Sequence, residues 1–108
     1  MDNSVFNNIR NWASERGIYE KGDVKTQFIK LQEELGELSR AILKKDEEEF
    51  VDAIGDAVVV LTNLAELGNK YFDKTDHKIN IESCIESAYD VIKNRKGKMD
   101  NGTFKKEE

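Results

Sequence analysis

The sequence contains no proline, and apolar residues recur at steps of three and four along most of its 108 residues. Proline breaks helices, whereas this spacing gathers apolar side chains on one face of a helix. The two features together favour helices throughout and predict an all-α fold. A chain of this length forms one compact core and is too short for two, so we expect a single domain.

Capping residues divide the chain into four expected helices. Gly17 suits the end of the first helix, and Asp23, Asp46 and Asn80 suit the starts of the others. The helices should run approximately over 4–16, 23–44, 46–68 and 80–92. Short connections imply antiparallel neighbours, so residues 1–98 should form an antiparallel four-helix bundle-like domain. The C-terminal segment 99–108 holds the turn signal Asn101-Gly102, which allows a short hairpin or a loose tail.

Two of these helices carry apolar stripes that we expect to face the core. The stripe of the second helix consists of Phe28, Leu31, Leu35, Leu38 and Ile42, and that of the third of Phe50, Ile54, Ala57, Leu61 and Leu64. Four short helices bury little surface alone, so association into a homodimer or homotetramer is expected.

Composition and charge exclude several classes of function. The net charge of -5 argues against binding to nucleic acid polymers, which requires a clustered cationic surface. No apolar run is long enough to span a bilayer and the N-terminus lacks signal-peptide features, so we expect no membrane partner and a cytoplasmic location. Cys84 is the only cysteine, which excludes an intrachain disulfide and predicts a small core residue. His77 is expected to be a solvated loop residue.

Carboxylates gather on the second and third helices in a way that calls for a cation. Glu33, Glu34 and Glu37 lie within a turn and a half in "EELGE", and Asp56 precedes the apolar run "AVVVL". A helix that is apolar nearly all round is buried, so Asp56 should lie beside a buried segment, where an unpaired carboxylate is costly. The third helix has no Lys or Arg to neutralise it. A divalent ion such as Mg²⁺ resolves the conflict, with Mn²⁺ as an alternative and a second ion plausible because four carboxylates exceed the charge of one.

Each of these features also has a plainer interpretation. Acids at helical spacing are often only a solvated face, although the pairing of two acidic turns favours a site. Gly36 and Gly55 lie inside those turns, where glycine costs about 1 kcal/mol relative to alanine. They indicate either a close approach by backbone, ligand or helix, or a tolerated substitution.

The segments "KLQEELGELSRAI", "DAIGDAVVVLTNLAE" and "IESAYDVIKNRKGK" resemble the MazG-like all-α nucleoside triphosphate pyrophosphohydrolases. That family pairs the motif EExxE with ExxD on the next helix, binds Mg²⁺ through them and cleaves nucleoside triphosphates to monophosphate and pyrophosphate. Glu33, Glu34 and Glu37 match the first motif. The second departs from the pattern, because Ala53 replaces its glutamate and leaves Asp52 one residue upstream of that position.

The resemblance implies roles for these acids in metal-assisted attack of water on the α-phosphorus. Glu34, Glu37, Asp52 and Asp56 would hold Mg²⁺, and Glu33, Glu34 and Glu37 form the catalytic set, with Glu33 a candidate base. Asp52 shares a helix face with Asp56 and can take the place of the missing glutamate.

Substrate contacts are expected from six further residues. Lys30 either reaches a phosphate or pairs with Glu34 four residues on. Asn63 either reads a base edge or is a buried amide, and Trp12 either stacks on a base or packs in the core. Lys93, Arg95 and Lys96 form a basic strip that either binds phosphate or complements the dipole of its helix.

Two functional hypotheses follow. The first is an Mg²⁺-dependent hydrolase that converts a (deoxy)nucleoside triphosphate to monophosphate and pyrophosphate. The second, motivated by Ala53, is a non-catalytic helical module that binds nucleotide or metal without turnover.

Overall fold

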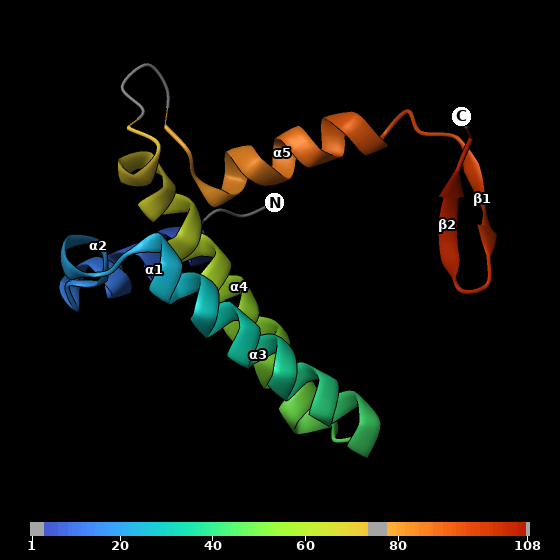
Figure 1. Cartoon of the computed structure of the whole chain (residues 1–108), viewed down its shortest axis with the longest axis horizontal. Coiled ribbons are helices and arrows are strands. Elements are labelled where there is room, and N and C mark those ends of the chain that lie inside the picture. Colours follow the sequence, from blue (N-terminus) through green and yellow to red (C-terminus); the bar gives the residue numbers. More distant parts are fainter. Residues whose placement is uncertain (1–3, 74–77, 108) are drawn as a thin grey trace.

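The computed structural model describes residues 4–73 and 78–107, and most of these are helical (Figure 1). The helices are α1 (Ser4–Glu15), α2 (Ile18–Lys21), α3 (Val24–Lys44), α4 (Glu47–Tyr71) and α5 (Ile81–Ile92). They are followed by strands β1 (Gly97–Asp100) and β2 (Thr103–Lys106). The predominantly helical fold is confirmed, while the short α2 was not predicted. Of the two alternatives for the C-terminus, the hairpin is observed.

The helix starts lie where the capping residues predict. Asp23 accepts a hydrogen bond from the backbone N–H of Thr26 at 2.8 Å. Asp46 and Asn80 each accept one from the backbone N–H three residues on, at 3.1 and 2.8 Å. These bonds satisfy N–H groups that have no partner within the helix, which explains why the starts can be read from the sequence.

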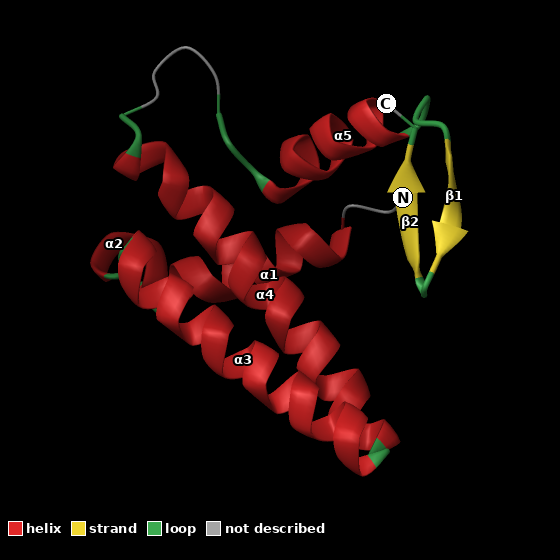
Figure 2. Cartoon of the chain, turned by 45° about the vertical axis from the view of Figure 1, so that its right-hand side comes forward, coloured by secondary structure: helices red, strands yellow, loops and turns green. Residues whose placement is uncertain are grey.

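Helices α3 and α4 form an antiparallel pair that lies side by side in both views (Figure 2). Small residues make the closest part of the contact: Ala41 of α3 is 1% exposed, and Ala53 and Ala57 of α4 are 2% and 8% exposed. Side chains without bulk let the two backbones approach closely. This approach brings the acidic turns of the two helices together.

The apolar stripes predicted for the second and third helices are wrong as core faces within one chain. Three residues of each stripe are exposed, namely Phe28, Leu35 and Ile42 on α3 and Phe50, Ile54 and Leu61 on α4. Leu31 and Leu38 are half-buried. On α4, Ala57 of the predicted stripe is buried and Leu64 is half-buried, so the stripe is covered only in part and most of its large apolar side chains are left on the surface of the pair.

Helix α5 points away from the α3–α4 pair and carries the hairpin with it (Figures 1 and 2). The expected four-helix bundle therefore does not close within one chain. The radius of gyration is 16.3 Å, larger than the roughly 13 Å of a compact domain of about 100 residues. The prediction that Cys84 is a core residue is also wrong, because this side of α5 is uncovered and Cys84 is exposed. Among the described residues, no helix is both long and apolar enough to cross a bilayer.

A charged cluster fixes the start of α5 against α1. The guanidinium of Arg10 donates two hydrogen bonds to the carboxylate of Glu82, at 2.7 and 2.6 Å, and lies 3.7 Å from Glu66 of α4. The hydrogen bonds from Arg10 lower the pKa of Glu82, whereas burial raises the pKa of Glu66. A bidentate arginine pair of this kind holds its partner in one orientation. Arg10 therefore joins α1, α4 and α5.

We expect Glu82→Gln to lower the free energy of unfolding by about 1 to 2 kcal/mol at neutral pH, because a charge-assisted hydrogen bond is lost. The folded-state pKa of Glu82 is lowered, so its contribution is fully present above the ordinary pKa of 4.5 and is lost as the pH falls through the lower folded value. Urea unfolding of both proteins between pH 7 and pH 3 measures this difference. A difference that persists unchanged at pH 3 would contradict the assignment.

Candidate functional site

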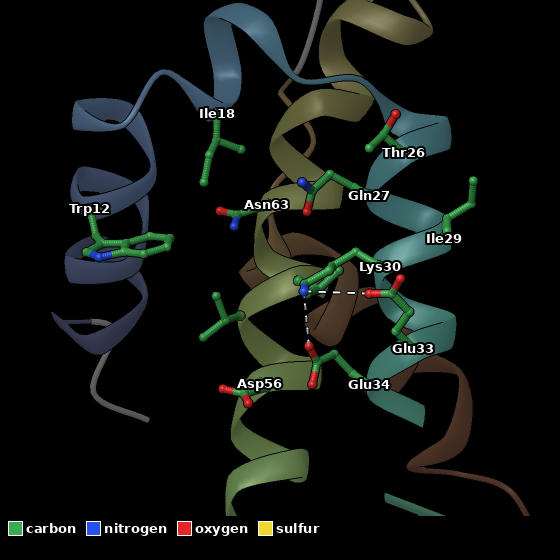
Figure 3. Close-up of a pocket in the computed structure, with 12 residues that line it drawn as sticks. Trp12, Ile18, Thr26, Gln27, Ile29, Lys30, Glu33, Glu34, Asp56 and Asn63 are labelled. Atoms are coloured by element: carbon green, nitrogen blue, oxygen red, sulfur yellow. Dashed lines mark ion pairs between the residues drawn. The ribbon is translucent and has the colours of Figure 1, made fainter. Parts of the chain in front are cut away.

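A cleft of about 450 Å³ opens between the α1–α2 segment and the α3–α4 pair (Figure 3). One end is acidic, with Glu34 from α3 and Asp56 from α4. The other end combines the apolar side chains of Trp12 and Ile18 with the amide of Asn63. A volume in this range, lined by apolar groups and a few polar ones, is typical of small-molecule sites.

Three carboxylates converge at the acidic end. Glu34, Glu37 and Asp56 each offer an oxygen, and these three atoms lie within 4.8 Å of one another. Glu34 and Glu37 share one face of α3 because they are three residues apart, and the alanine-lined helix contact brings Asp56 to them from α4. Two neighbouring helices thus supply one cluster, as the sequence predicts.

Glu34 is the buried member of the cluster. It is 7% exposed, and its Oε2 atom has no hydrogen-bond partner in the described part of the chain. Burial raises the pKa of its carboxyl, and the nearby Glu37 and Asp56 raise it further, while Lys30 opposes them. A buried carboxylate oxygen without a partner is costly and rare, which points to a ligand that the protein chain does not provide.

The cluster fits a hard divalent cation. Its donors are carboxylate oxygens from two helices, and one of them, Oε2 of Glu34, is buried and unpartnered. Mg²⁺ prefers oxygen ligands and is commonly held by a few carboxylates together with water and substrate phosphates. Mn²⁺ accepts the same ligands. Glu34, Glu37 and Asp56 would therefore be its protein ligands.

Burial within the cluster differs from the sequence-based expectation. Asp56 was expected beside a buried segment. In the apolar run that follows it, Ala57 and Val60 are buried, whereas Asp56 itself, Val58 and Leu61 are exposed. Glu34 is buried instead, because α3 turns this face toward α4. The expected burial is therefore found on only one side of the run, and the carboxylate of Asp56 lies in the cluster.

The remaining predicted acids lie outside the converging group. Asp52 is exposed one turn before Asp56, and Ala53, at the position of the missing glutamate, is buried at the helix contact. The side chain of Glu33 is 61% exposed and points outward, with its carboxylate 3.6 Å from the ammonium of Lys30. The roles of Asp52 as ligand and of Glu33 as base stay predictions.

Of the two roles that the sequence left open for Lys30, the ion pair with Glu34 is observed, and contact with a phosphate stays a prediction. Its ammonium lies 3.6 Å from Glu33 and 3.8 Å from Glu34, so it pairs with the acidic turn (Figure 3). Its side chain also lines the cleft and is 54% exposed, which keeps it accessible to a phosphate.

Trp12 and Asn63 line the other end of the cleft. Trp12 is 44% exposed and the guanidinium of Arg16 lies 4.4 Å from its ring centroid, so Trp12 is not a core residue. Asn63 is 3% exposed and accepts a hydrogen bond from the hydroxyl of Tyr19. It is both a buried amide and a cleft residue. Ile18 and Tyr19 were missed, because the single turn of α2 has too few residues to show a helical pattern.

The basic strip is not brought to the cleft. Lys93 and Arg95 follow the end of α5, and Lys96 lies beside the hairpin, far from the α3–α4 pair in Figure 1. Lys93 instead lies 3.2 Å from Asp90. Phosphate binding by these residues stays a prediction that requires a second copy of the chain. His77 lies outside the described residues.

The two glycines of the acidic turns do not mark a close helix contact. An added Cβ at Gly36 or Gly55 would meet no protein atom within 4 Å in the described part of the chain. Of the alternatives left open by the sequence, an approach by the neighbouring helix is therefore excluded within this chain.

Comparison with known proteins agrees with this arrangement of acids. The family model described as the MazG nucleotide pyrophosphohydrolase domain matches residues 23–99, which is most of the chain. The chain belongs to the MazG family. The matched region begins at the cap of α3 and contains every acid of the cluster, whereas α1 and α2 of this MazG protein precede it.

The chain is also similar to an uncharacterized 18.2 kDa protein in the rep-hol intergenic region of Haemophilus phage HP1. The two are 41% identical over 61 residues, which cover 56% of this chain and 37% of the phage protein. The MazG chain thus aligns with little more than a third of that relative. No solved structure matches this chain.

The Glu34→Gln variant should be more stable than the unchanged protein without metal, but it should bind Mg²⁺ more weakly. Without metal, we expect this change to raise the free energy of unfolding by about 1 kcal/mol, because it removes a buried carboxylate that faces two others. Added Mg²⁺ should raise the melting temperature of the unchanged protein and should have little effect on the variant, since ligand binding stabilises the folded state. Thermal unfolding with and without MgCl₂ measures both effects.

The matched control is Glu86→Gln, which removes an exposed carboxylate from α5 outside the cleft. This variant should keep the full response to Mg²⁺. An equal response of Glu34→Gln and Glu86→Gln would show that the cluster does not hold the ion.

Proposed function

We propose that this MazG protein is an Mg²⁺-dependent hydrolase that cleaves a (deoxy)nucleoside triphosphate to the monophosphate and pyrophosphate. The observation that carries the proposal is the convergence of Glu34, Glu37 and Asp56 around a buried, unpartnered carboxylate oxygen at one end of a cleft. Membership of the MazG nucleotide pyrophosphohydrolase family supports the same reaction class. The apolar far end of the cleft is suited to a nucleobase, and the acidic end is suited to metal-bound phosphates. The cleft can therefore accept both parts of a nucleotide.

In this proposal, different side chains along the cleft bind the metal, contact the phosphates and activate the water. Glu34, Glu37 and Asp56 bind the metal, with Asp52 as a further predicted ligand one turn away. When bound, Mg²⁺ would neutralise phosphate charge and make the attacking water more acidic. Lys30, which lines the cleft, would contact a phosphate oxygen, and the exposed Glu33 would orient and deprotonate a water.

A second candidate is a nucleotide- or metal-binding module without turnover. The observation in its favour is Ala53, which is 2% exposed and supplies no oxygen at the position where the family motif has a glutamate. Such a module would keep the metal response and would release no pyrophosphate.

Glu37→Gln should abolish pyrophosphate release, because it removes one of three converging ligands while leaving the helix contact in place. Asp52→Asn should reduce the rate less, since its carboxylate lies outside the converging group. The measurement is pyrophosphate released from a panel of nucleoside triphosphates with Mg²⁺ or Mn²⁺, with and without a chelator. Nucleotide binding without any product from the unchanged protein would instead support the non-catalytic module.

We propose further that the protein is a homodimer or homotetramer held by the exposed apolar residues of α3 and α4. Leu35, Ile42, Ile54 and Leu61 are each 38% or more exposed, and the chain is more extended than a compact domain of its size. Large apolar side chains gathered on one helix pair are typical of an interface between chains. A second copy would complete the bundle that one chain leaves open. A cytoplasmic location stays a prediction.

Ile54→Glu should shift the protein to a monomer, because a charge replaces an apolar side chain at the centre of this face. Lys44→Glu, which adds the same acid at the exposed end of α3, should leave the assembly unchanged. Sedimentation equilibrium of both variants measures the molar mass. A monomeric unchanged protein would refute the proposed assembly.

A further inference from the structure

A tyrosine outside the region matched by the family model holds the amide of Asn63. The hydroxyl of Tyr19, on α2, donates a hydrogen bond of 2.7 Å to Oδ1 of Asn63, on α4. The family match begins at residue 23, so Tyr19 precedes the matched region. The contact joins residues that are 44 positions apart in the sequence.

The hydrogen bond from Tyr19 uses the oxygen of the Asn63 amide, so the NH₂ group of that amide remains available to a ligand. A carboxamide has one oxygen and one NH₂ group, and here the oxygen is the atom that faces Tyr19. Asn63 is 3% exposed, lines the cleft, and makes no other hydrogen bond in the described part of the chain. Its Nδ2 atom is not among the completely buried unpartnered atoms of the described residues, so it retains access to the cleft. Figure 3 shows the side chain extending from α4 toward the side of Trp12 and Ile18.

The surroundings of Tyr19 keep its hydroxyl protonated. Burial raises the pKa of Tyr19 to about 12, and the neighbouring Glu66 raises it while Arg10 lowers it. The phenol therefore stays protonated at neutral pH. Arg10, whose charge acts on Tyr19, donates two hydrogen bonds to Glu82 of α5.

We propose that Tyr19 is a positioning residue that turns the NH₂ group of Asn63 into the cleft, so that Asn63 selects nucleobases presenting a hydrogen-bond acceptor. This inference rests on the proposed function, because it assigns the base end of the same cleft. Trp12 and Ile18 would pack against the base. Of the uncharged polar side chains that line the cleft, namely Thr26, Gln27 and Asn63, only Asn63 is buried, and it is the one whose oxygen is held by Tyr19.

The physical basis of the selection is the cost of an unpaired buried group. A base with a carbonyl oxygen at this point accepts a hydrogen bond from the amide, whereas an amino group there places two donors against each other. Sites built around a buried hydrogen-bonding group reject the mismatched ligand strongly for this reason. Without the hydroxyl of Tyr19, the amide can rotate and offer its oxygen, so the selection weakens.

The test uses substrate pairs that differ mainly in one exocyclic group. In each pair, dUTP with dCTP and dITP with dATP, the first carries a carbonyl where the second carries an amino group. We expect the unchanged protein to favour the carbonyl member in kcat/KM for pyrophosphate release. Tyr19→Phe should reduce that preference by roughly threefold to tenfold, the value of one neutral hydrogen bond, through KM more than through kcat.

Two variants complete the design. Tyr89→Phe removes the hydroxyl of an exposed tyrosine on α5 and should keep the full preference. Asn63→Asp replaces the NH₂ group with an acceptor oxygen and should shift the preference toward the amino members. Thermal unfolding of each variant verifies that it is folded.

Specific results would overturn the inference. These are a preference of the unchanged protein for amino bases, or a Tyr19→Phe variant that loses kcat equally for all substrates and keeps the ratio. Absence of pyrophosphate from the unchanged protein would overturn the proposed function alone, and calorimetric affinities of the same four nucleotides with Mg²⁺ would then supply the ratios. Absence of binding as well would overturn both.

Discussion

Packing of α3 against α4 brings three carboxylates together, and the chain's own cations do not fully offset their mutual repulsion. Glu34 is buried where α3 meets α4, and Glu37 and Asp56 converge on it. Lys30 is the cation beside it, at 3.8 Å, and that pair is partly exposed. Ala53 and Ala57 are buried where α3 and α4 pack, so the packing of this helix pair also brings the acids of the two helices together.

The cleft has two halves with different origins. The acidic half lies within the region that matches the MazG family, whereas the apolar half combines Trp12 and Ile18 of the preceding α1–α2 segment with Asn63 of α4. Arg10 and Tyr19 connect the two, because Arg10 ties α1 to Glu66 and Glu82 while Tyr19 holds Asn63.

The chain leaves much of its apolar surface uncovered. Helix α5 and the hairpin project from the α3–α4 pair, and both strands are exposed along their length. An isolated two-stranded hairpin is at best marginally stable in water, so it gains from further contacts. The strip at 93–96 lies on this projecting part and away from the cleft. A second copy would account for the exposed stripes, the projecting arm and the remote basic residues together.

The sequence by itself determined the local features: helix starts at Asp23, Asp46 and Asn80, the hairpin turn, and acids on two adjacent helices. Capping and turn formation involve residues only a few positions apart, so the sequence contains the whole interaction. Tertiary structure decided which helix faces meet and that Glu34, not Asp56, is buried. It also placed Tyr19 against Asn63. Helical periodicity identifies an apolar stripe but not the surface that it packs against. Here most large apolar side chains of the stripes are exposed, while alanines are buried between the helices.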